Sequence, residues 1–374
     1  MIPYGYHSID EDDISAVANV LRGEWLTTGP IVEKFEYELE KIVGAKCGVF
    51  SSGTAALHCA FAAIDLQPGD EVITPPITFI ATQATAALSG ASIVFADVLD
   101  DTANIDPIAV EAVITKKTKA IVAVDYAGHP ADLSELRSIA DKYGIYLIED
   151  AAHSLGSVYK NQPVGSIADL TTFSFFPTKN ITSGEGGAIA SNNEDLLRKA
   201  KLFGRQGMVK NQDEMLLEID GPWHQEVHKF GLNYRLPDIL CALGISQLSR
   251  IQEFKKSRGE LFSRYQQIFS GYKDLRLPTR KEFVDPMWHL YPIRVPSEKR
   301  HEIFIRLREN GIGVQVNYLP AHKHPVFLKN GKKLKEFPIA EKFYSEEISL
   351  PMMSLNTQLD ENYFSRLAEL LVIN

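Results

Sequence analysis

The segment at residues 173–191, FSFFPTKNITSGEGGAIAS, contains a lysine with unusual neighbours. Lysine side chains normally lie on the solvated surface, and that is the expected position of an arbitrary lysine after a turn. Lys179, however, follows a run of aromatic residues and precedes glycines that permit close backbone approach. Burial of an ammonium group lowers its pKa and frees the amine to attack an aldehyde. The segment therefore predicts a lysine that forms a Schiff base.

Pyridoxal 5'-phosphate (PLP) is the aldehyde cofactor that such a lysine would hold. Its ring acts as an electron sink when an acidic side chain pairs with the pyridine nitrogen. Asp150 ends the apolar run YLIED upstream of the lysine and can be that partner. A helix N-cap is the alternative role of this aspartate, and without Lys179 it would be the better interpretation.

A phosphate-binding turn is predicted where FSSGTAAL passes from a strand into a helix. Ser52, Gly53 and Thr54 offer hydroxyl and backbone N–H groups at a helix N-terminus, which is a site that binds phosphate. Plain N-capping explains the same residues about as well. Ser174 lies five positions before Lys179 and can add a further hydroxyl.

Two ring-bearing residues complete the predicted cofactor site. Phe79 follows a predicted strand and could stack on the pyridine ring, and His153 could stack or hydrogen-bond at the opposite face. A position in the core is the alternative for each. The individual signals are weak, but their order along the chain, each at a predicted strand end, favours one PLP site.

The elements that must position these residues alternate between short apolar runs and amphipathic stretches from residue 45 to 190. This alternation predicts an α/β fold with a mostly parallel sheet covered on both faces, and ligands bind at the carboxyl ends of such strands. Residues 132–144 read as a helix with Asp132 as N-cap and Gly144 as its stop. Strands are predicted at 46–50, 70–76, 92–98, 120–128 and 145–154, with helices at 53–66 and 78–90.

The pattern changes near residue 245, where a smaller α+β domain is predicted. Residues 246–269 read as one long amphipathic helix with Ile251, Phe254, Phe262, Tyr265 and Phe269 on its apolar stripe. Strands are expected at 288–295 and 311–319, and helices at 301–311 and 360–372. We therefore expect a large domain at 1–250, whose N-terminal segment packs on the small domain at 251–374. The polar stretch at 206–230 reads as a long functional loop.

Composition narrows the functional classes. The 374 residues carry a net charge of −9 without a basic run, which argues against nucleic-acid binding. The N-terminus does not resemble a signal peptide, and no apolar run is long enough to span a bilayer. Cys47, Cys59 and Cys241 are scattered and form neither a disulfide framework nor a metal pattern. We expect a cytoplasmic protein whose cysteines fill the core.

Taken together, the motifs resemble those of the DegT/StrS-type nucleotide-sugar aminotransferases, over essentially the whole chain. The resemblance rests on WLTTGP (25–30), SSGTAAL (51–57), TFIAT (78–82), EDAAHSLGS (149–157), FSFFPTKNITSGEGGAI (173–189), GLNYRLPDILCALGISQL (231–248) and GVQVNYLPAH (313–322). It implies the fold of PLP-dependent transferases of fold type I, like that of aspartate aminotransferase, with a mixed, mostly parallel central sheet.

The resemblance also implies a role for each matching residue. Lys179 would carry PLP as the Schiff base, and Asp150 would pair with the pyridine nitrogen. Gly53, Thr54 and Ser174 would hold the phosphate, and Phe79 would stack on the ring. Asn233, in the NYR motif, would reach the phosphate in the neighbouring subunit, which implies a homodimer with shared active sites.

Within the family, the chain looks closest to the aminotransferases of pseudaminic acid biosynthesis. That likeness implies transfer of an amino group from L-glutamate to C4 of UDP-4-keto-6-deoxy-L-AltNAc. His153 stands where a glutamine is more common, and Asn317 gives VNY in place of VHY. Thr28, Tyr318 and His322 are candidates to line the sugar site. Arg235 could receive the glutamate carboxylate, with an ion pair at the dimer interface as the alternative.

Other readings are weaker. A different nucleotide keto sugar, linked to dTDP or GDP and aminated at C3 or C4, would suit the same cofactor site. A PLP-dependent sugar dehydratase would replace the lysine with histidine or add cysteines for an iron–sulfur cluster. A non-catalytic regulator, or a structural protein with a decayed site, would not need the intact pair of Lys179 and Asp150. His322 and His324 lack further ligands nearby, so no metal site is expected.

Overall fold

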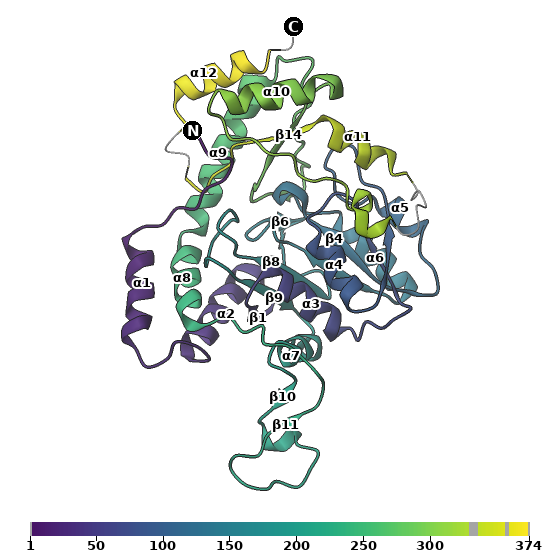
Figure 1. The fold of residues 1–374 in the computed structure, drawn as a ribbon, viewed down its shortest axis with the longest axis vertical. Coiled ribbons are helices and arrows are strands. Elements are labelled where there is room, and N and C mark those ends of the chain that lie inside the picture. The colour runs from purple at the N-terminus through teal and green to yellow at the C-terminus, as the bar shows by residue number, and fades with distance from the viewer. Residues whose placement is uncertain (1, 329–335, 356–358, 373–374) are drawn as a thin grey trace.

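The computed structural model describes residues 2–328, 336–355 and 359–372. Its centre is a seven-stranded sheet with the strand order β1-β9-β8-β5-β4-β2-β3, which forms the middle layer of the molecule in Figure 1. The strands are β1 (Lys46–Phe50), β2 (Glu71–Thr74), β3 (Ser92–Phe95), β4 (Thr118–Val124), β5 (Tyr146–Asp150), β8 (Leu170–Ser174) and β9 (Gly187–Ser191).

The neighbouring strands β8, β5, β4, β2 and β3 run parallel to one another, while β9 is antiparallel to both β8 and β1. The sheet is therefore mixed and mostly parallel, as the alternating pattern predicted. Continuous apolar runs such as AIVAV in β4 fit strands that are covered on both faces. The antiparallel β9 returns the chain beside β8, so the Lys179 loop between them opens at the carboxyl end of the parallel strands.

Helices cover the two faces of this sheet. The helix α3 is rich in alanine and nearly all buried, because it packs against α7, β8 and β9. In α6, Gly144 ends the helix in a left-handed conformation as predicted, but Asp132 does not cap it, since its carboxylate accepts from the Tyr159 hydroxyl. The helices are α1 (Glu11–Arg22), α2 (Pro30–Val43), α3 (Gly53–Ala63), α4 (Ala81–Leu88), α5 (Pro107–Glu111), α6 (Leu133–Tyr143) and α7 (Glu194–Phe203).

The C-terminal part has its own core beneath a two-stranded antiparallel sheet of β13 (Tyr291–Arg294) and β14 (Glu347–Leu350). The apolar stripe predicted for residues 251–269 is buried, but it is shared between two cores: Phe262, Tyr265 and Phe269 lie in this one, while Ile251 and Phe254 pack in a core beside the large sheet. This part lies at the top of Figure 1, next to the N-terminus. Its helices are α9 (Ile251–Phe269), α10 (Ser297–Glu309), α11 (Pro338–Glu346) and α12 (Glu361–Leu370). The division of the chain at residue 250 stays a prediction.

Two predicted elements differ from the structure. The long helix at 246–269 is interrupted at Arg250, which leaves α8 (Asp238–Ser249) and α9 as separate helices. The guanidinium of Arg250 pairs with Asp10 and Asp13 of the N-terminal segment, so tertiary contacts lie at the break. The predicted strand at 311–319 is absent among the described residues, where only single bridges join Ile312 to Ile2 and Gln315 to Ser349.

The stretch at 206–230 is less irregular than expected from its polar sequence. Two short strands, β10 (Met208–Val209) and β11 (Glu226–Val227), pair antiparallel and form a hairpin. The hairpin projects away from the body of the molecule, at the bottom of Figure 1. Near its tip the Glu226 carboxylate accepts from the backbone N–H groups of Leu216 and Leu217 and contacts two histidines.

The remaining regular elements are short. They are β6 (Val158–Tyr159), β7 (Gln162–Pro163) and β12 (Val284–Asp285), and the 3-10 helices η1 (Tyr126–Gly128), η2 (Gln212–Glu214), η3 (Ala321–Lys323) and η4 (Pro325–Phe327). No helix among the described ranges is both long enough and apolar enough to cross a membrane.

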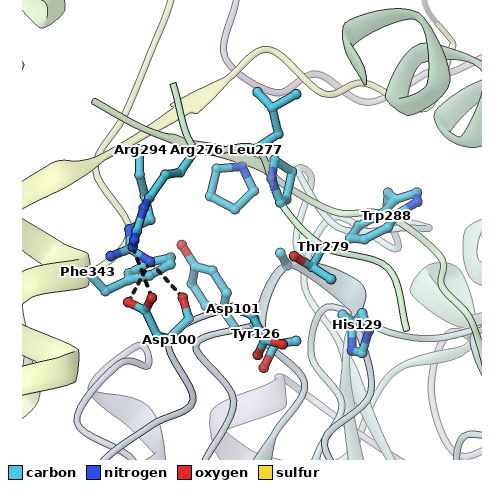
Figure 2. Close-up of a pocket in the computed structure, with 14 residues that line it drawn as sticks. Asp100, Asp101, Tyr126, His129, Arg276, Leu277, Thr279, Trp288, Arg294 and Phe343 are labelled. Atoms are coloured by element: carbon cyan, nitrogen blue, oxygen red, sulfur yellow. Dashed lines mark hydrogen bonds and ion pairs between the residues drawn. The ribbon is translucent and has the colours of Figure 1, made fainter. Parts of the chain in front are cut away.

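A cavity of about 320 Å³ lies where η1 meets the C-terminal part of the chain. Figure 2 shows Arg276 and Arg294 extending from one side of it toward Asp100 on the other. Both guanidinium groups pair with the Asp100 carboxylate, at 3.0 and 2.8 Å. These ion pairs join the loop after β3 to the C-terminal part, and the cationic groups on this wall are already neutralised.

Candidate active site

The predicted catalytic pair lies at the carboxyl end of the parallel strands. Asp150 is the last residue of β5, and Lys179 follows β8 in the loop that leads to β9. Burial lowers the pKa of Lys179 to about 8, and the charge of Asp150 opposes this shift. A lysine with this pKa has a substantial uncharged fraction near neutral pH, which is what attack on an aldehyde requires.

Asp150 is held in a defined orientation by two donors. The Thr82 hydroxyl donates to Oδ2 at 2.7 Å, and the Ala152 N–H donates to Oδ1 at 3.3 Å. Burial raises the pKa of Asp150, while these hydrogen bonds favour its charged form. A buried, oriented carboxyl group fits the partner of a pyridinium nitrogen. Thr82 was missed by sequence reasoning, although it lies only three residues after Phe79.

The predicted phosphate-binding residues meet at the N-terminus of α3. A Cβ atom added at Gly53 would lie 2.8 Å from Cβ of Ser174, and one added at Gly187 would lie 2.5 Å from the Ser52 carbonyl oxygen. Glycine at both positions lets β8 and β9 pass directly beneath the turn. The Ser52 hydroxyl accepts from the Ala55 N–H at 3.0 Å, so this side chain also has its capping role.

This turn has the donor set that a phosphate group requires. The first-turn N–H groups of a helix lack intrahelical acceptors, and in α3 they belong to Gly53 and Thr54. The Ser174 hydroxyl adds a further donor beside them, because its Oγ lies close to Gly53. Together with Lys179 and Asp150, these groups fit a phosphate-bearing pyridine aldehyde.

Three ring side chains stand around this position. The Phe79 ring is 58% exposed and lies 6.2 Å from the Tyr318 ring, centroid to centroid. The Tyr318 hydroxyl is 3.2 Å from Nε2 of His153. Burial and the positive charge of Lys179 hold the pKa of His153 well below its usual value. His153 therefore acts as a neutral hydrogen-bonding group.

Two further residues support the site and were not predicted. His289 is buried, and its ring lies 4.2 Å from that of His153. Arg258 is fully buried in α9 and donates to the Trp288 carbonyl at 3.0 Å and to the Lys179 carbonyl at 3.5 Å. The histidine inside the apolar run WHLY is the signal that could have indicated the first; the arginine gave none.

Three predicted residues lie apart from this cluster within one chain. Asn233 is exposed, next to Tyr234, whose carbonyl accepts from the Ser51 N–H. Arg235 donates to the Gln206 side chain at 2.7 Å. Thr28 lines the same small hollow as Arg235, and Tyr318 is not among the residues around it. Their roles toward cofactor and substrate stay predictions.

His322 lies in an apolar part of the core rather than at an open surface. It is buried, packs against the rings of Phe95 and Phe337, and contacts Glu341 at 3.2 Å. Its contribution to a sugar site stays a prediction. No group of three or more ligating side chains suited to a metal ion occurs in the part of the chain that the structure describes.

The pKa of Lys179 predicts how the protein without cofactor takes up PLP. We expect the uptake rate to rise about tenfold per pH unit below pH 8 and to level off above it, because the neutral amine is the nucleophile. Stopped-flow absorbance would measure this. Asp150→Asn should move the midpoint to lower pH, since the Asp150 charge raises the pKa of Lys179. A rate independent of pH would contradict the assignment.

Comparisons with known proteins identify the family of this chain. The sequence profile of the DegT/DnrJ/EryC1/StrS aminotransferase family matches residues 7–364. A Campylobacter jejuni protein named UDP-4-amino-4,6-dideoxy-N-acetyl-beta-L-altrosamine transaminase is 38% identical over 358 residues, which is 94% of this chain and 92% of that protein. These matches extend over nearly the whole chain.

Solved structures share the fold. Helicobacter pylori PseC, described as an aminotransferase involved in the biosynthesis of pseudoaminic acid, superposes with a TM-score of 0.90 at 33% identity, over 99% of this chain and 97% of that chain. Spr1654 from Streptococcus pneumoniae was solved in a PMP form, with a TM-score of 0.91 at 31% identity over 99% of this chain and 98% of that chain. The same protein was also solved in a PLP form.

The fold of this chain agrees with that of these relatives. The predicted cofactor, fold class and enzyme class are confirmed by the family match. The chain belongs to the DegT/DnrJ/EryC1/StrS aminotransferase family and is a PLP-dependent sugar aminotransferase.

Proposed function

We propose that the protein transfers the amino group of L-glutamate to C4 of UDP-4-keto-6-deoxy-L-AltNAc. The observation that carries the chemistry is the buried lysine whose pKa is lowered to about 8, beside an aspartate oriented by Thr82. The choice of sugar is supported by the Campylobacter jejuni and Helicobacter pylori relatives and by their printed names. The two substrates use the same site in turn, in a ping-pong cycle.

The residues of this chain divide the work. PLP, when bound, supplies an electron sink for the pair of electrons released at the amino acid Cα. Asp150 keeps the proton on the ring nitrogen, which that sink requires. Once displaced by L-glutamate, the Lys179 amine takes the Cα proton as general base and returns a proton on the cofactor side as general acid. Ser174 and the first turn of α3 fix the phosphate.

The second half-reaction, in which the keto sugar receives the amino group, tests the sugar assignment. The PLP-bound enzyme would first be treated with L-glutamate until the visible absorption band of the bound cofactor is lost. UDP-4-keto-6-deoxy-L-AltNAc, its D-gluco epimer and a dTDP-4-keto-6-deoxyhexose would then be added to separate samples. We expect the band to return, and mass spectrometry to detect an amino sugar, with only the first of these three sugars. Return with another sugar alone would leave the enzyme class in place and overturn the substrate.

We further propose a homodimer in which each subunit completes the other's site. The hairpin at 206–230 carries exposed apolar side chains, and Trp223, in the loop between its strands, and Phe230, at its base, are 72% and 96% exposed. Large exposed apolar groups favour a protein partner. Asn233 follows the hairpin directly and is also exposed, so a partner subunit would bring its cofactor phosphate to this side chain.

Mixing two inactive variants tests this shared site. An equal mixture of Lys179→Ala and Asn233→Ala subunits should regain about a quarter of the wild-type rate, because half of the dimers are mixed and each has one complete site. Refolding or subunit exchange followed by a coupled assay would measure it. The unmixed variants are the controls. If the mixture is no more active than the mean of the two variants, the sites are not shared.

A further inference from the structure

Asn317 is the residue of the VNY motif that the proposed chemistry leaves without a role. It is 6% exposed and directly precedes Tyr318. Four hydrogen bonds hold it. Its N–H donates to Glu347 Oε2 at 2.7 Å, and its carbonyl accepts from the Tyr126 hydroxyl at 2.6 Å. Its amide Nδ2 donates to the Tyr4 hydroxyl at 2.5 Å and to Ser349 Oγ at 3.1 Å.

These partners come from segments that are far apart in the sequence. Tyr4 belongs to the N-terminal segment, Glu347 and Ser349 belong to β14, and Tyr126 belongs to η1 of the large sheet's connections. The Ser349 hydroxyl also bonds to the Glu347 carboxyl group. The Tyr126 ring lines the cavity in Figure 2. Asn317 therefore connects the N-terminal segment, β14 and η1 through its hydrogen bonds.

The side chain of Asn317 is committed to this network and cannot also bind a sugar through its amide N–H groups. Both hydrogens of Nδ2 have acceptors within hydrogen-bond distance. An imidazole nitrogen carries at most one hydrogen, so a histidine at this position could not donate to both acceptors from one atom. The departure from VHY thus changes what lies behind Tyr318, not a group that faces the substrate.

The next residue along the chain faces the site. The Tyr318 hydroxyl lies 3.2 Å from His153 Nε2, and its ring stands 6.2 Å from that of Phe79. Because both main-chain polar groups of Asn317 are held, the backbone that carries Tyr318 has little freedom. Buried polar networks whose members are satisfied make a local structure rigid.

We propose that Asn317 is a positioning residue that acts on the reaction through Tyr318, by fixing that side chain against His153. This inference rests on the proposed function, because its readout is transamination of a keto sugar. By the same argument, Tyr4 helps to position Tyr318 indirectly, through its hydrogen bond with the Asn317 amide. The N-terminal segment is thereby part of the support of the active site.

A double-mutant cycle tests the proposal. In the wild-type background, Asn317→Ala should lower kcat/KM for the keto sugar about tenfold, which corresponds to the loss of one or two buried hydrogen bonds. In a Tyr318→Ala background the same substitution should change it less than twofold. Tyr4→Phe is the milder second variant and should show the same non-additivity. PLP affinity should stay unchanged in all of them.

Tyr363→Phe is the matched control, because it also removes a buried hydrogen bond. That bond joins the hydroxyl groups of Tyr363 and Tyr265, 2.6 Å apart, in the C-terminal core. It should lower the melting temperature without changing kcat/KM. Losses from Asn317→Ala and Tyr318→Ala that simply add in an active protein would overturn this inference alone. A wild-type protein that transaminates no keto sugar would overturn the proposed function, and this inference with it.

Discussion

Replacement of Lys179 by alanine is expected to abolish turnover. In the proposed mechanism, the amine is both the attachment point of PLP and the base and acid that moves the proton at the amino acid Cα. No other lysine shares its burial with a pKa lowered to about 8 among the residues that the structure describes. Steady-state assay of amino-sugar formation would measure the loss, and the fall should exceed the range of about 100- to 10,000-fold that a general base alone contributes.

Lys199→Ala is the matched control for this substitution. Lys199 lies on α7, and its ammonium group pairs with Asp195 at the surface. A surface pair of this kind contributes little, so the rate should be unchanged. Lys179→Ala should still bind PLP through the phosphate turn. Turnover near the wild-type level in this variant would remove the lysine from the mechanism.

Replacement of Asp150 by asparagine has the second largest expected effect. The variant keeps the shape of the side chain and can still contact Thr82, but it removes the charge that is proposed to hold the proton on the ring nitrogen. We expect kcat to fall about 100- to 1,000-fold, the range found when one preorganised electrostatic partner of a transition state is lost. The affinity for PLP should change less, because its phosphate is expected to be bound by Gly53, Thr54 and Ser174.

Thr82→Val gives an internal comparison for that prediction. It removes the 2.7 Å hydrogen bond to Asp150 but leaves the carboxylate in place, so its rate should lie between those of the wild type and Asp150→Asn. The order of the three rates in the glutamate half-reaction is the measurement. Equal rates for Asp150→Asn and the wild type would show that this carboxylate does not serve the ring nitrogen.

The sequence predicted the sheet, and it indicated candidate cofactor residues, because the relevant signals are local. Apolar runs fix the strands, and glycine and hydroxyl residues mark the turn that enters α3. Lys179 and Asp150 could be found for the same reason, since each ends or follows a buried run. The family resemblance then ordered these residues into one site.

The parts that escaped prediction depend on contacts between distant segments. The helical pattern continues through Arg250, but its ion pairs with Asp10 and Asp13 come from the other end of the chain. The run at 311–319 has a strand-like composition, yet the backbone N–H and carbonyl groups of Asn317 form hydrogen bonds with the side chains of Glu347 and Tyr126. Side-chain partners of this kind are not visible in a pattern of residue types.

The same limit applied to the support of the site. Thr82 lies in a predicted helix, but only the fold places its hydroxyl within hydrogen-bond distance of Asp150, at the end of β5. His289 looked like part of a strand, and the tilted contact of its ring with that of His153 depends on how the residues after α9 return to the sheet. Candidate catalytic residues could therefore be proposed from the sequence, while the contacts that orient them required the fold.

Chemical trapping tests the central claim most directly. The purified enzyme would be treated with borohydride, which fixes PLP onto the lysine that holds it, and then digested and analysed by mass spectrometry. We predict the added mass on the peptide that contains Lys179, and its loss when L-glutamate is added before the reductant. Labelling of another lysine, or labelling of Lys179 that L-glutamate does not prevent, would contradict the account.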